Sequence, residues 1–307
     1  MNPFHKDLAE LNLDKLQSVS SEMTLADLVT EFNSKNFGAF GVTDESGALV
    51  GIVSERDLLL RTKPSDFSRW GEIKISTIMS KKIFSLDFDK SIADAIQMMS
   101  RMEFRHLPIK KDNEYLILSA RTLLDLVISN YQEICDKFGT LKDWDTHTGH
   151  IHEENHLFLG KSDTLDTGTF LFAPIKEVGG SDLLKVDAEL SIAQLWQTMS
   201  DAHLPVAAIS AWGTLLKGVV TERDFITKVF PKGESELSKP TKSLMTEKPH
   251  HMMLKHHIVY ALNNMGKYRY RNVLIVDEDK FPVLNAELIH FLKFFSKIIE
   301  ANASANA

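Results

Sequence analysis

Apolar residues recur at helical spacing in several short segments of the chain. In residues 25–32 (LADLVTEF) and 92–99 (IADAIQMM), apolar side chains fall at i, i+3, i+4 and i+7, which predicts amphipathic helices. Two apolar runs follow the first of these helices, residues 38–43 and 48–53, and the turn-forming residues 44–47 (DESG) separate them. A second helix follows the runs. The pattern predicts a β-α-β-β-α unit of about 60 residues that occurs four times.

The sequence pattern of the first half of the chain returns in the second half. GIVSERD (residues 51–57) recurs as GVVTERD (218–224), at an offset of 167 residues. Segments on both sides keep nearly the same spacing: TLADL (24–28) matches SIAQL (191–195) at 167, and IMSKK (78–82) matches LMTEK (244–248) at 166. This near-constant offset indicates two copies of one architecture.

Composition narrows the class of protein. The 307 residues carry a net charge of −7, so binding to nucleic acid is not expected. The one cysteine, Cys135, cannot form an internal disulfide, which excludes a disulfide scaffold. The polar start of the chain is not typical of a signal peptide, and no apolar run approaches the about 18 residues that a membrane span needs. We therefore expect a cytoplasmic protein without membrane insertion.

Residues 51–57 place a hydroxyl group and a carboxylate where a strand turns into a helix. Ser54 is suited to cap the helix, with Asp57 as its capping-box partner, and this interpretation requires no ligand. The same pair also suits a nucleotide. A helix N-terminus and a hydroxyl group favour phosphate, and a carboxylate one turn later can accept both hydroxyl groups of a ribose. The repeat supplies the pair again as Thr221 and Asp224.

The chain resembles CBS domains in three features: the β-α-β-β-α unit, the strand-to-helix corner, and the strand RHLPI (residues 105–109). The corner has the pattern Gly, two apolar residues, Ser or Thr, two further residues, and Asp. These modules are named after cystathionine β-synthase and work in pairs called Bateman modules. Two pairs in one chain are similar to the gamma subunit of AMP-activated protein kinase. The resemblance implies an α+β (α/β) fold of four CBS motifs in two pseudo-twofold Bateman modules.

The resemblance also implies domain bounds. We expect the first pair over residues 1–130, with motif 1 at about 13–65 and motif 2 at about 75–130. We expect the second pair over 181–298, with motif 3 at about 181–232 and motif 4 at about 241–298. Residues 131–180 would then form a linker or insertion rich in His and Asp, and residues 299–307 a frayed tail.

In CBS proteins, adenosine nucleotides bind in clefts between paired motifs. Asp holds the ribose, Ser or Thr meets the phosphate, and basic residues before the partner motif's strand neutralise the phosphate charge. The resemblance therefore implies four binding residues in each pair: Ser54, Asp57, Arg105 and His106 in the first, and Thr221, Asp224, Arg269 and Arg271 in the second. The ligand would be AMP, ADP, ATP or a related adenosyl compound, with Mg²⁺ as a companion of the phosphates and no required cofactor.

Two corners depart from the family pattern. In motif 2 (residues 116–122), Thr122 stands where the ribose carboxylate is expected, and in motif 4 (residues 282–288), Leu288 stands there. Neither side chain can hold a ribose as a carboxylate does. We therefore expect at most two nucleotide sites, one in each pair.

These features favour a ligand-sensing regulatory protein and not an enzyme, because no motif of a hydrolase or a P-loop is present. The output would pass to a regulated partner protein or through a homodimer. Two alternatives remain open: an oligomerisation scaffold whose clefts hold no ligand, and a metal-binding protein. The candidate metal ligands are His147, His150, His152 and His156. The basic residues 267–272 (KYRYRN) could stack on single-stranded nucleic acid, but a phosphate role explains them more simply.

Overall fold

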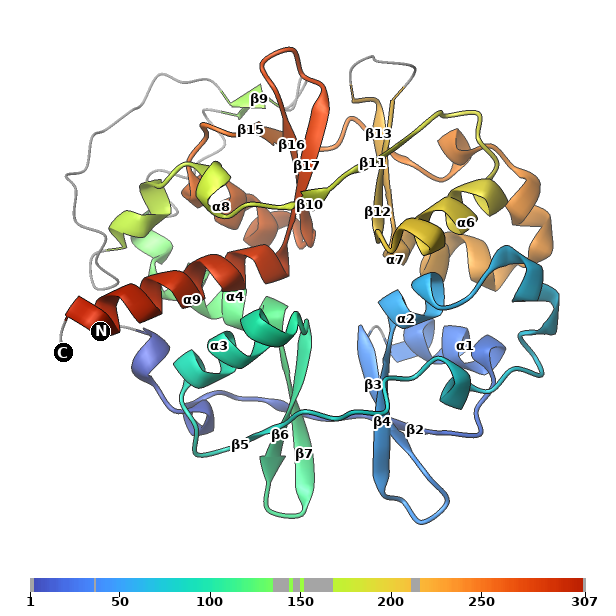
Figure 1. Cartoon of the computed structure of the whole chain (residues 1–307), viewed down its shortest axis with the longest axis horizontal. Coiled ribbons are helices and arrows are strands. Elements are labelled where there is room, and N and C mark those ends of the chain that lie inside the picture. Colours follow the sequence, from blue (N-terminus) through green and yellow to red (C-terminus); the bar gives the residue numbers. More distant parts are fainter. Residues whose placement is uncertain are drawn as a thin grey trace. The chain divides into compact units, whose positions relative to one another are not determined.

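The structure of the chain is a computed structural model that describes residues 3–35, 37–134, 144–145, 150–151, 168–210 and 216–305 (Figure 1). Four β-α-β-β-α motifs follow one another along the chain. This order confirms the α+β fold class and the fourfold unit that the apolar pattern predicts. The apolar stripe of the first helix is buried, as its helical spacing requires, and consists of Leu25, Leu28, Val29 and Phe32.

Each motif has an entry strand, a first helix, two hairpin strands and a second helix. Motif 1 consists of β2 (Ser18–Ser20), α1 (Leu25–Lys35), β3 (Ala39–Thr43), β4 (Leu49–Ser54) and α2 (Glu55–Leu60). Motif 2 consists of β5 (Leu86–Asp87), α3 (Ile92–Met102), β6 (His106–Lys111), β7 (Glu114–Ser119) and α4 (Ala120–Asn130). Motif 3 consists of β11 (Leu184–Val186), α6 (Ile192–Ala202), β12 (Val206–Ile209), β13 (Gly218–Thr221) and α7 (Glu222–Asp224). Motif 4 consists of β15 (His251–Met253), α8 (Ile258–Tyr268), β16 (Asn272–Val276), β17 (Pro282–Glu287) and α9 (Leu288–Ala305).

The hairpin register aligns the four motifs at the point where the second hairpin strand ends. In every motif the entry strand pairs parallel to the first hairpin strand, which pairs antiparallel to the second. The first residue of each hairpin therefore lies opposite its last residue, in the pairs Ala39–Ser54, His106–Ser119, Val206–Thr221 and Asn272–Glu287. Three short strands extend the sheets: β1 (Asp14–Lys15) beside β7, β10 (Ser181–Asp182) beside β17, and β14 (Thr246–Glu247) beside β13.

The chain divides into two compact units, and each is assembled from distant segments. Unit 1 contains Met1–Lys15, Ser85–Ser181 and His250–Ala307, and unit 2 contains Leu16–Phe84 and Asp182–Pro249. Unit 1 therefore joins motifs 2 and 4, and unit 2 joins motifs 1 and 3. The pairs expected from the sequence follow chain order, so each contributes one motif to each unit. The functional pairing of motifs 1 with 2 and 3 with 4 stays a prediction.

Each unit has its own buried apolar core. In unit 1, the rings of Phe4 and Phe295 lie 6.0 Å apart between centroids, which ties the start of the chain to helix α9. In unit 2, aromatic rings from both motifs form a cluster in which Trp70 lies 5.5 Å from Trp196 and 4.7 Å from Phe230. Burial of such large rings supplies much of the free energy that holds two motifs in one unit.

Helix α9 continues through residues 299–305, where the sequence analysis expects a frayed tail. The apolar spacing explains the difference, because Phe291, Phe295 and Ile299 are all buried on the core side of the helix. Alanine then supports the last turn, since it has the highest helix propensity. The Asn302 side chain also donates to the Ile298 carbonyl at 2.8 Å.

Part of the expected linker belongs to the core of unit 1. The short 3-10 helix Thr169–Phe172 buries Phe170, whose ring lies 5.9 Å from that of Phe295. Further upstream, β8 (Trp144–Asp145) pairs antiparallel with β9 (His150–Ile151). Residues 168–180 are thus a structural element of unit 1 and not only a connection.

Candidate functional site

The corner of motif 1 is held closed by its own carboxylate. Ser54 ends β4 with extended backbone, and both its backbone N–H, at 2.8 Å, and its hydroxyl group, at 2.6 Å, donate to Asp57 Oδ2. The other oxygen of Asp57, Oδ1, lies 3.1 Å from Arg61 Nε. The side chain of Asp57 is 13 % exposed. The capping interpretation of this corner is confirmed, and the Asp57 carboxylate keeps one face beside a cation.

The corner of motif 3 repeats this arrangement. The backbone N–H and the hydroxyl group of Thr221 donate to Asp224 Oδ2 at 2.8 and 2.9 Å. Lys228 Nζ donates to Asp224 Oδ1 at 2.6 Å. The second corner therefore has the same hydroxyl, carboxylate and cation, with lysine in place of arginine.

The cation at each corner also reaches the segment that leads out of the motif. Arg61 donates to the carbonyl of Ile78 at 2.7 Å, and Lys228 approaches the carbonyl of Leu244 at 3.5 Å. Sequence reasoning missed Arg61 and Lys228. The available signal was their position four residues after each aspartate, which puts both groups on one helix face, together with the same repeat offset.

Reciprocal ion pairs link the two corners inside unit 2. Glu55, which is fully buried, pairs with Arg223 of motif 3, and Arg56 Nε lies 3.5 Å from Glu222 Oε2. The repeat offset of 167 residues relates Glu55 to Glu222 and Arg56 to Arg223, so the same Glu–Arg contact is made twice. Helices α2 and α7 are therefore joined by charge as well as by apolar packing, and both aspartate corners belong to one unit.

The corner of motif 2 has the cap without the carboxylate. Ser119 ends β7, and its hydroxyl oxygen accepts a hydrogen bond from the backbone N–H of Thr122 at 3.0 Å. The two hydroxyl groups lie 2.8 Å apart. The structure thus places Thr122 at the position that Asp57 has in motif 1, as the sequence alignment predicts.

The corner of motif 4 lies two residues later than the sequence alignment places it. Glu287 occupies the cap position, because it pairs with Asn272 as Ser119 pairs with His106. Three residues later, His290 Nδ1 accepts a hydrogen bond from the Glu287 backbone N–H at 2.9 Å. The assignment of Leu288 to the carboxylate position is therefore wrong, and His290 stands there. The cause is the hairpin of motif 4, which is two residues longer than that of motif 2.

The basic residues expected to meet phosphate lie in unit 1, at the start of the hairpins. Arg105 and Arg271 occupy equivalent backbone positions, since their carbonyls accept from the first helical N–H groups of Ala120, at 2.8 Å, and Leu288, at 3.3 Å. Both arginines are partly exposed, and His106 begins strand β6. In motif 4 the equivalent of His106 is Asn272, and its side chain accepts from Asn285 Nδ2 at 3.2 Å.

Arg269 has a structural partner within unit 1. It ends helix α8 in the left-handed region, at φ 61°, and its Nη1 lies 2.8 Å from Asp125 Oδ2 on α4. A phosphate group at Arg269 would have to share the guanidinium with this carboxylate. Arg271, whose position matches Arg105, is therefore the stronger of the two candidates in motif 4.

A further arginine joins motifs 2 and 4. Arg121 donates to the carbonyl of Met265 in the last turn of helix α8, at 3.0 Å, and to that of Tyr270, two residues after the helix ends. Burial, opposed by Asp125 and assisted by the charges of Arg269 and Arg271, lowers the pKa of Arg121 to about 10. The group stays cationic at neutral pH, so this part of unit 1 is locally basic although the chain is acidic.

The metal hypothesis concerns residues that lie mostly outside the described part of the chain. Cys135, His147, His152 and His156 all fall there, and His150 is placed only as a backbone position of β9. Among the described residues, no group of three or more His, Cys, Asp or Glu side chains is arranged to hold a metal ion. Within the same ranges, every helix is too short or too polar to cross a bilayer.

Comparison with known proteins identifies the modules. The family model of the CBS domain matches residues 8–62 and 75–127. The CBS domain-containing protein YhcV of Bacillus subtilis is 31 % identical over 115 residues, which are 38 % of this chain and 79 % of YhcV. CBSCBSPB2 of Arabidopsis thaliana, another CBS domain-containing protein, is 22 % identical over 304 residues and 97 % of this chain, but the chain spans only 55 % of its length.

A solved structure shows the same fold over nearly the whole chain. Protein MJ1225 of Methanocaldococcus jannaschii, proposed as an archaeal homologue of γ-AMPK, superposes with a TM-score of 0.68 at 15 % identity. The match covers 94 % of this chain and 98 % of MJ1225. It includes the second half of the chain, where the repeat and the element order show the same motif. The chain is a member of the CBS-domain family.

Proposed function

We propose that the protein is a regulatory sensor that binds adenosine nucleotides or a related adenosyl ligand. One observation carries the proposal: the corners of motifs 1 and 3 have the same hydroxyl, carboxylate and cation in the same geometry. A carboxylate that is already oriented by its neighbours is well suited to accept the two hydroxyl groups of a ribose. We assign this role to Asp57 and Asp224, with Ser54 and Thr221 beside the phosphate.

The basic partners in the proposal come from the family resemblance. Arg105 and His106 serve the ligand of Asp57, and Arg271, with Arg269, serves the ligand of Asp224. The lowered pKa of Arg121, caused in part by the charges of Arg269 and Arg271, supports an anion-binding role for this side of unit 1. The fold shared with MJ1225, a proposed γ-AMPK homologue, agrees with the same class of ligand.

The proposed output is a change in the affinity for a partner protein or for a second copy of the chain. A nucleotide can regulate such a partner only if two states of the protein bind the nucleotide with different affinity. The proposal includes no catalytic step, and both CBSCBSPB2 and YhcV are named as CBS domain-containing proteins.

A thermal-shift assay with AMP, ADP and ATP tests the proposal. Ligand at about 100 times its dissociation constant stabilises a protein by about 2.7 kcal/mol, which raises the melting temperature. Asp57→Asn and Asp224→Asn keep an oxygen for the cap but remove the charge that accepts from the ribose. Each should weaken one site by about tenfold or more, because a hydrogen bond to a charged group contributes about 1.5–3 kcal/mol.

Asp94→Asn is the matched control. Asp94 accepts from the Ser91 hydroxyl group at 2.7 Å in the same capping geometry, but at the start of helix α3 and not at a strand-to-helix corner. Its substitution should change the melting temperature without changing nucleotide affinity. No stabilisation by any adenosine compound would favour the ligand-free scaffold, and unaltered affinity in both corner variants would remove the assignment of the aspartates.

A further inference from the structure

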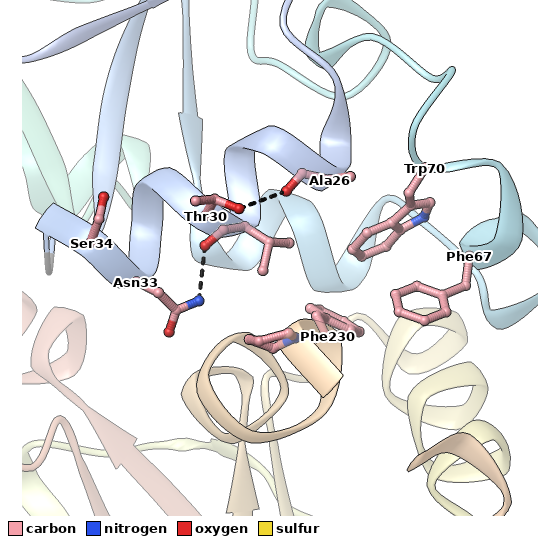
Figure 2. Close-up of a pocket in the computed structure, with 9 residues that line it drawn as sticks. Ala26, Thr30, Asn33, Ser34, Phe67, Trp70 and Phe230 are labelled. Carbon is pink, nitrogen blue, oxygen red and sulfur yellow. Dashed lines mark hydrogen bonds between the residues drawn. The ribbon is translucent and has the colours of Figure 1, made fainter. Parts of the chain in front are cut away.

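A half-open cavity of about 550 Å³ lies in unit 2, away from both aspartate corners (Figure 2). The rings of Phe67, Trp70 and Phe230 gather at one side of it, with centroid separations of 4.7 to 5.7 Å. Helix α1 supplies the polar groups, among them Thr30 and Asn33. Aromatic walls with a small number of polar groups are typical of cavities that bind small aromatic molecules.

The repeat explains why the cavity exists. Val29 on α1 stands at the position that Trp196 has on α6, at the offset of 167 residues. The indole of Trp196 is completely buried, and its Nε1 donates to the carbonyl of Leu59 at 3.0 Å. The carbonyl equivalent to that of Leu59 is the one of Ile226, to which Asn33 Nδ2 donates at 2.9 Å. A valine side chain lacks the ring, so the space beside it stays open.

We propose that this cavity binds a small planar aromatic molecule of the size of an indole. The ligand takes the place that the Trp196 indole fills in the other motif of the unit. Its ring packs against Trp70 and Phe230, and the polar side chains of Thr30 and Asn33 on α1 lie at the same cavity.

The site is independent of the proposed nucleotide sites. None of the residues that line the cavity belongs to a corner, and no nucleotide-binding residue is among them. Loss of nucleotide binding therefore leaves this proposal unchanged, and the reverse also holds.

Ligand-observed NMR on the intact chain, with indole as the probe, tests the proposal. Val29→Trp fills the cavity with the ring that the repeat carries at this position, and it should lower indole affinity by about tenfold or more. Because Val29 is buried, the larger side chain can also disturb packing. Ala26→Phe is therefore the second variant, since Ala26 is exposed on α1 and lines the cavity. It obstructs the cavity without entering the core.

Ala193→Phe is the matched control for the second variant. Ala193 is the equivalent of Ala26 on helix α6, and it lines no part of the cavity. We expect saturable indole binding by the wild type and by Ala193→Phe, with equal affinity, and at least about tenfold weaker binding by Val29→Trp and Ala26→Phe. No saturable binding to the wild type at the solubility limit of indole, or equal binding by all four proteins, would overturn the proposal.

Discussion

The carboxylates of Asp57 and Asp224 each use one oxygen inside the protein and present the other to a cation. Oδ2 closes the corner by accepting from the backbone and hydroxyl groups of Ser54 or Thr221. Oδ1 faces Arg61 or Lys228. A bound ribose would therefore meet a carboxylate whose orientation is set before the ligand arrives, and less conformational entropy would be lost on binding.

Arg121 is the residue whose loss should weaken unit 1 most directly. Its guanidinium donates to carbonyls at the end of helix α8, and its side chain is only 14 % exposed. Arg121→Met leaves those carbonyls without the donor and removes a favourable charge at the helix C-terminus. We expect the free energy of unfolding to fall by about 2–4 kcal/mol, measured by urea denaturation.

Arg101→Met is the control for this loss of charge. Arg101 lies on α3 in the same unit, and its side chain is 72 % exposed. Its Nη2 lies 3.9 Å from Glu300 Oε1. Exposed ion pairs contribute little, so this variant should stay within about 0.5 kcal/mol of the wild type. Equal destabilisation by the two substitutions would show that Arg121 does not hold motifs 2 and 4 together.

His250 should make the protein less stable in mild acid. Burial lowers the pKa of His250 below its usual 6.5, so the folded state resists the proton that the unfolded state accepts. The unfolded chain therefore binds more protons as pH falls below 6.5, and stability decreases until the pH has passed the folded pKa. Above pH 6.5 the unfolded chain also leaves His250 neutral, so the stability that the neutral His250 allows is fully present there.

Calorimetric melting between about pH 5 and 8 measures this effect in the wild type and in His250→Gln. The ring of His250 lies 5.0 Å from that of Tyr268, and glutamine keeps a polar side chain there without a titrating group. The variant should lose part of the acid-induced decrease in melting temperature. An unchanged pH profile would show that another group causes the decrease.

At the scale of single residues, the sequence predicts which side chains form the capping pairs better than it predicts their further partners. The capping pairs Ser54–Asp57 and Thr221–Asp224 follow from residue type and spacing, and the structure confirms them. Arg61 was missed because a cation four residues after an acid is common on any helix surface. The error at Leu288 arose because the length of a hairpin loop is not visible in an ungapped alignment.

At the scale of elements, the contact between α2 and α7 is the feature that the sequence did not suggest. Glu55 and Arg56 of one motif pair with Arg223 and Glu222 of the other, although about half of the chain separates them. Each residue type is ordinary in a helix start, where Glu is favoured by the dipole, so the pattern alone gives no sign of the partner. Only the fold brings the two copies of the same contact together.

A double-mutant cycle measures this contact. Arg223→Met removes a partner of the buried Glu55 carboxylate and should destabilise unit 2 by about 3 kcal/mol, because the charge is left with less compensation. The further change Glu55→Gln removes that charge and should restore part of the loss. Additive effects of the two substitutions, within about 0.5 kcal/mol, would show that the side chains do not interact.

The elements themselves are largely predictable. Apolar spacing locates the first helix and the hairpin of each motif, because those residues face a core. It fails at the end of α9 and in residues 168–180, where a frayed tail and a linker are expected but aromatic and aliphatic residues are buried. Burial there depends on packing against distant segments, which local composition does not reveal.

At the scale of the whole molecule, the sequence predicts four motifs but not which of them share a core. Chain order suggests motifs 1 with 2 and 3 with 4, whereas the compact units join 1 with 3 and 2 with 4. Four similar motifs present similar apolar faces, so a periodic pattern cannot distinguish these partners. Side chains such as Trp70 and Trp196, which meet across motifs 1 and 3, decide the matter only once the fold is known.

The two units also divide the chemistry of the proposed sites. Unit 2 carries both aspartate corners, and unit 1 carries Arg105, His106 and the arginines of motif 4.

The stoichiometry of nucleotide binding tests this account most directly. Isothermal titration calorimetry of the intact chain, with whichever of AMP, ADP and ATP binds most tightly, counts the sites. We expect no more than two sites per chain, because among the four strand-to-helix corners only those of motifs 1 and 3 present a carboxylate at this position, Asp57 and Asp224. Asp57→Asn and Asp224→Asn should each remove one. Three or four equivalent sites, no site at all, or an undiminished number in both variants would contradict it.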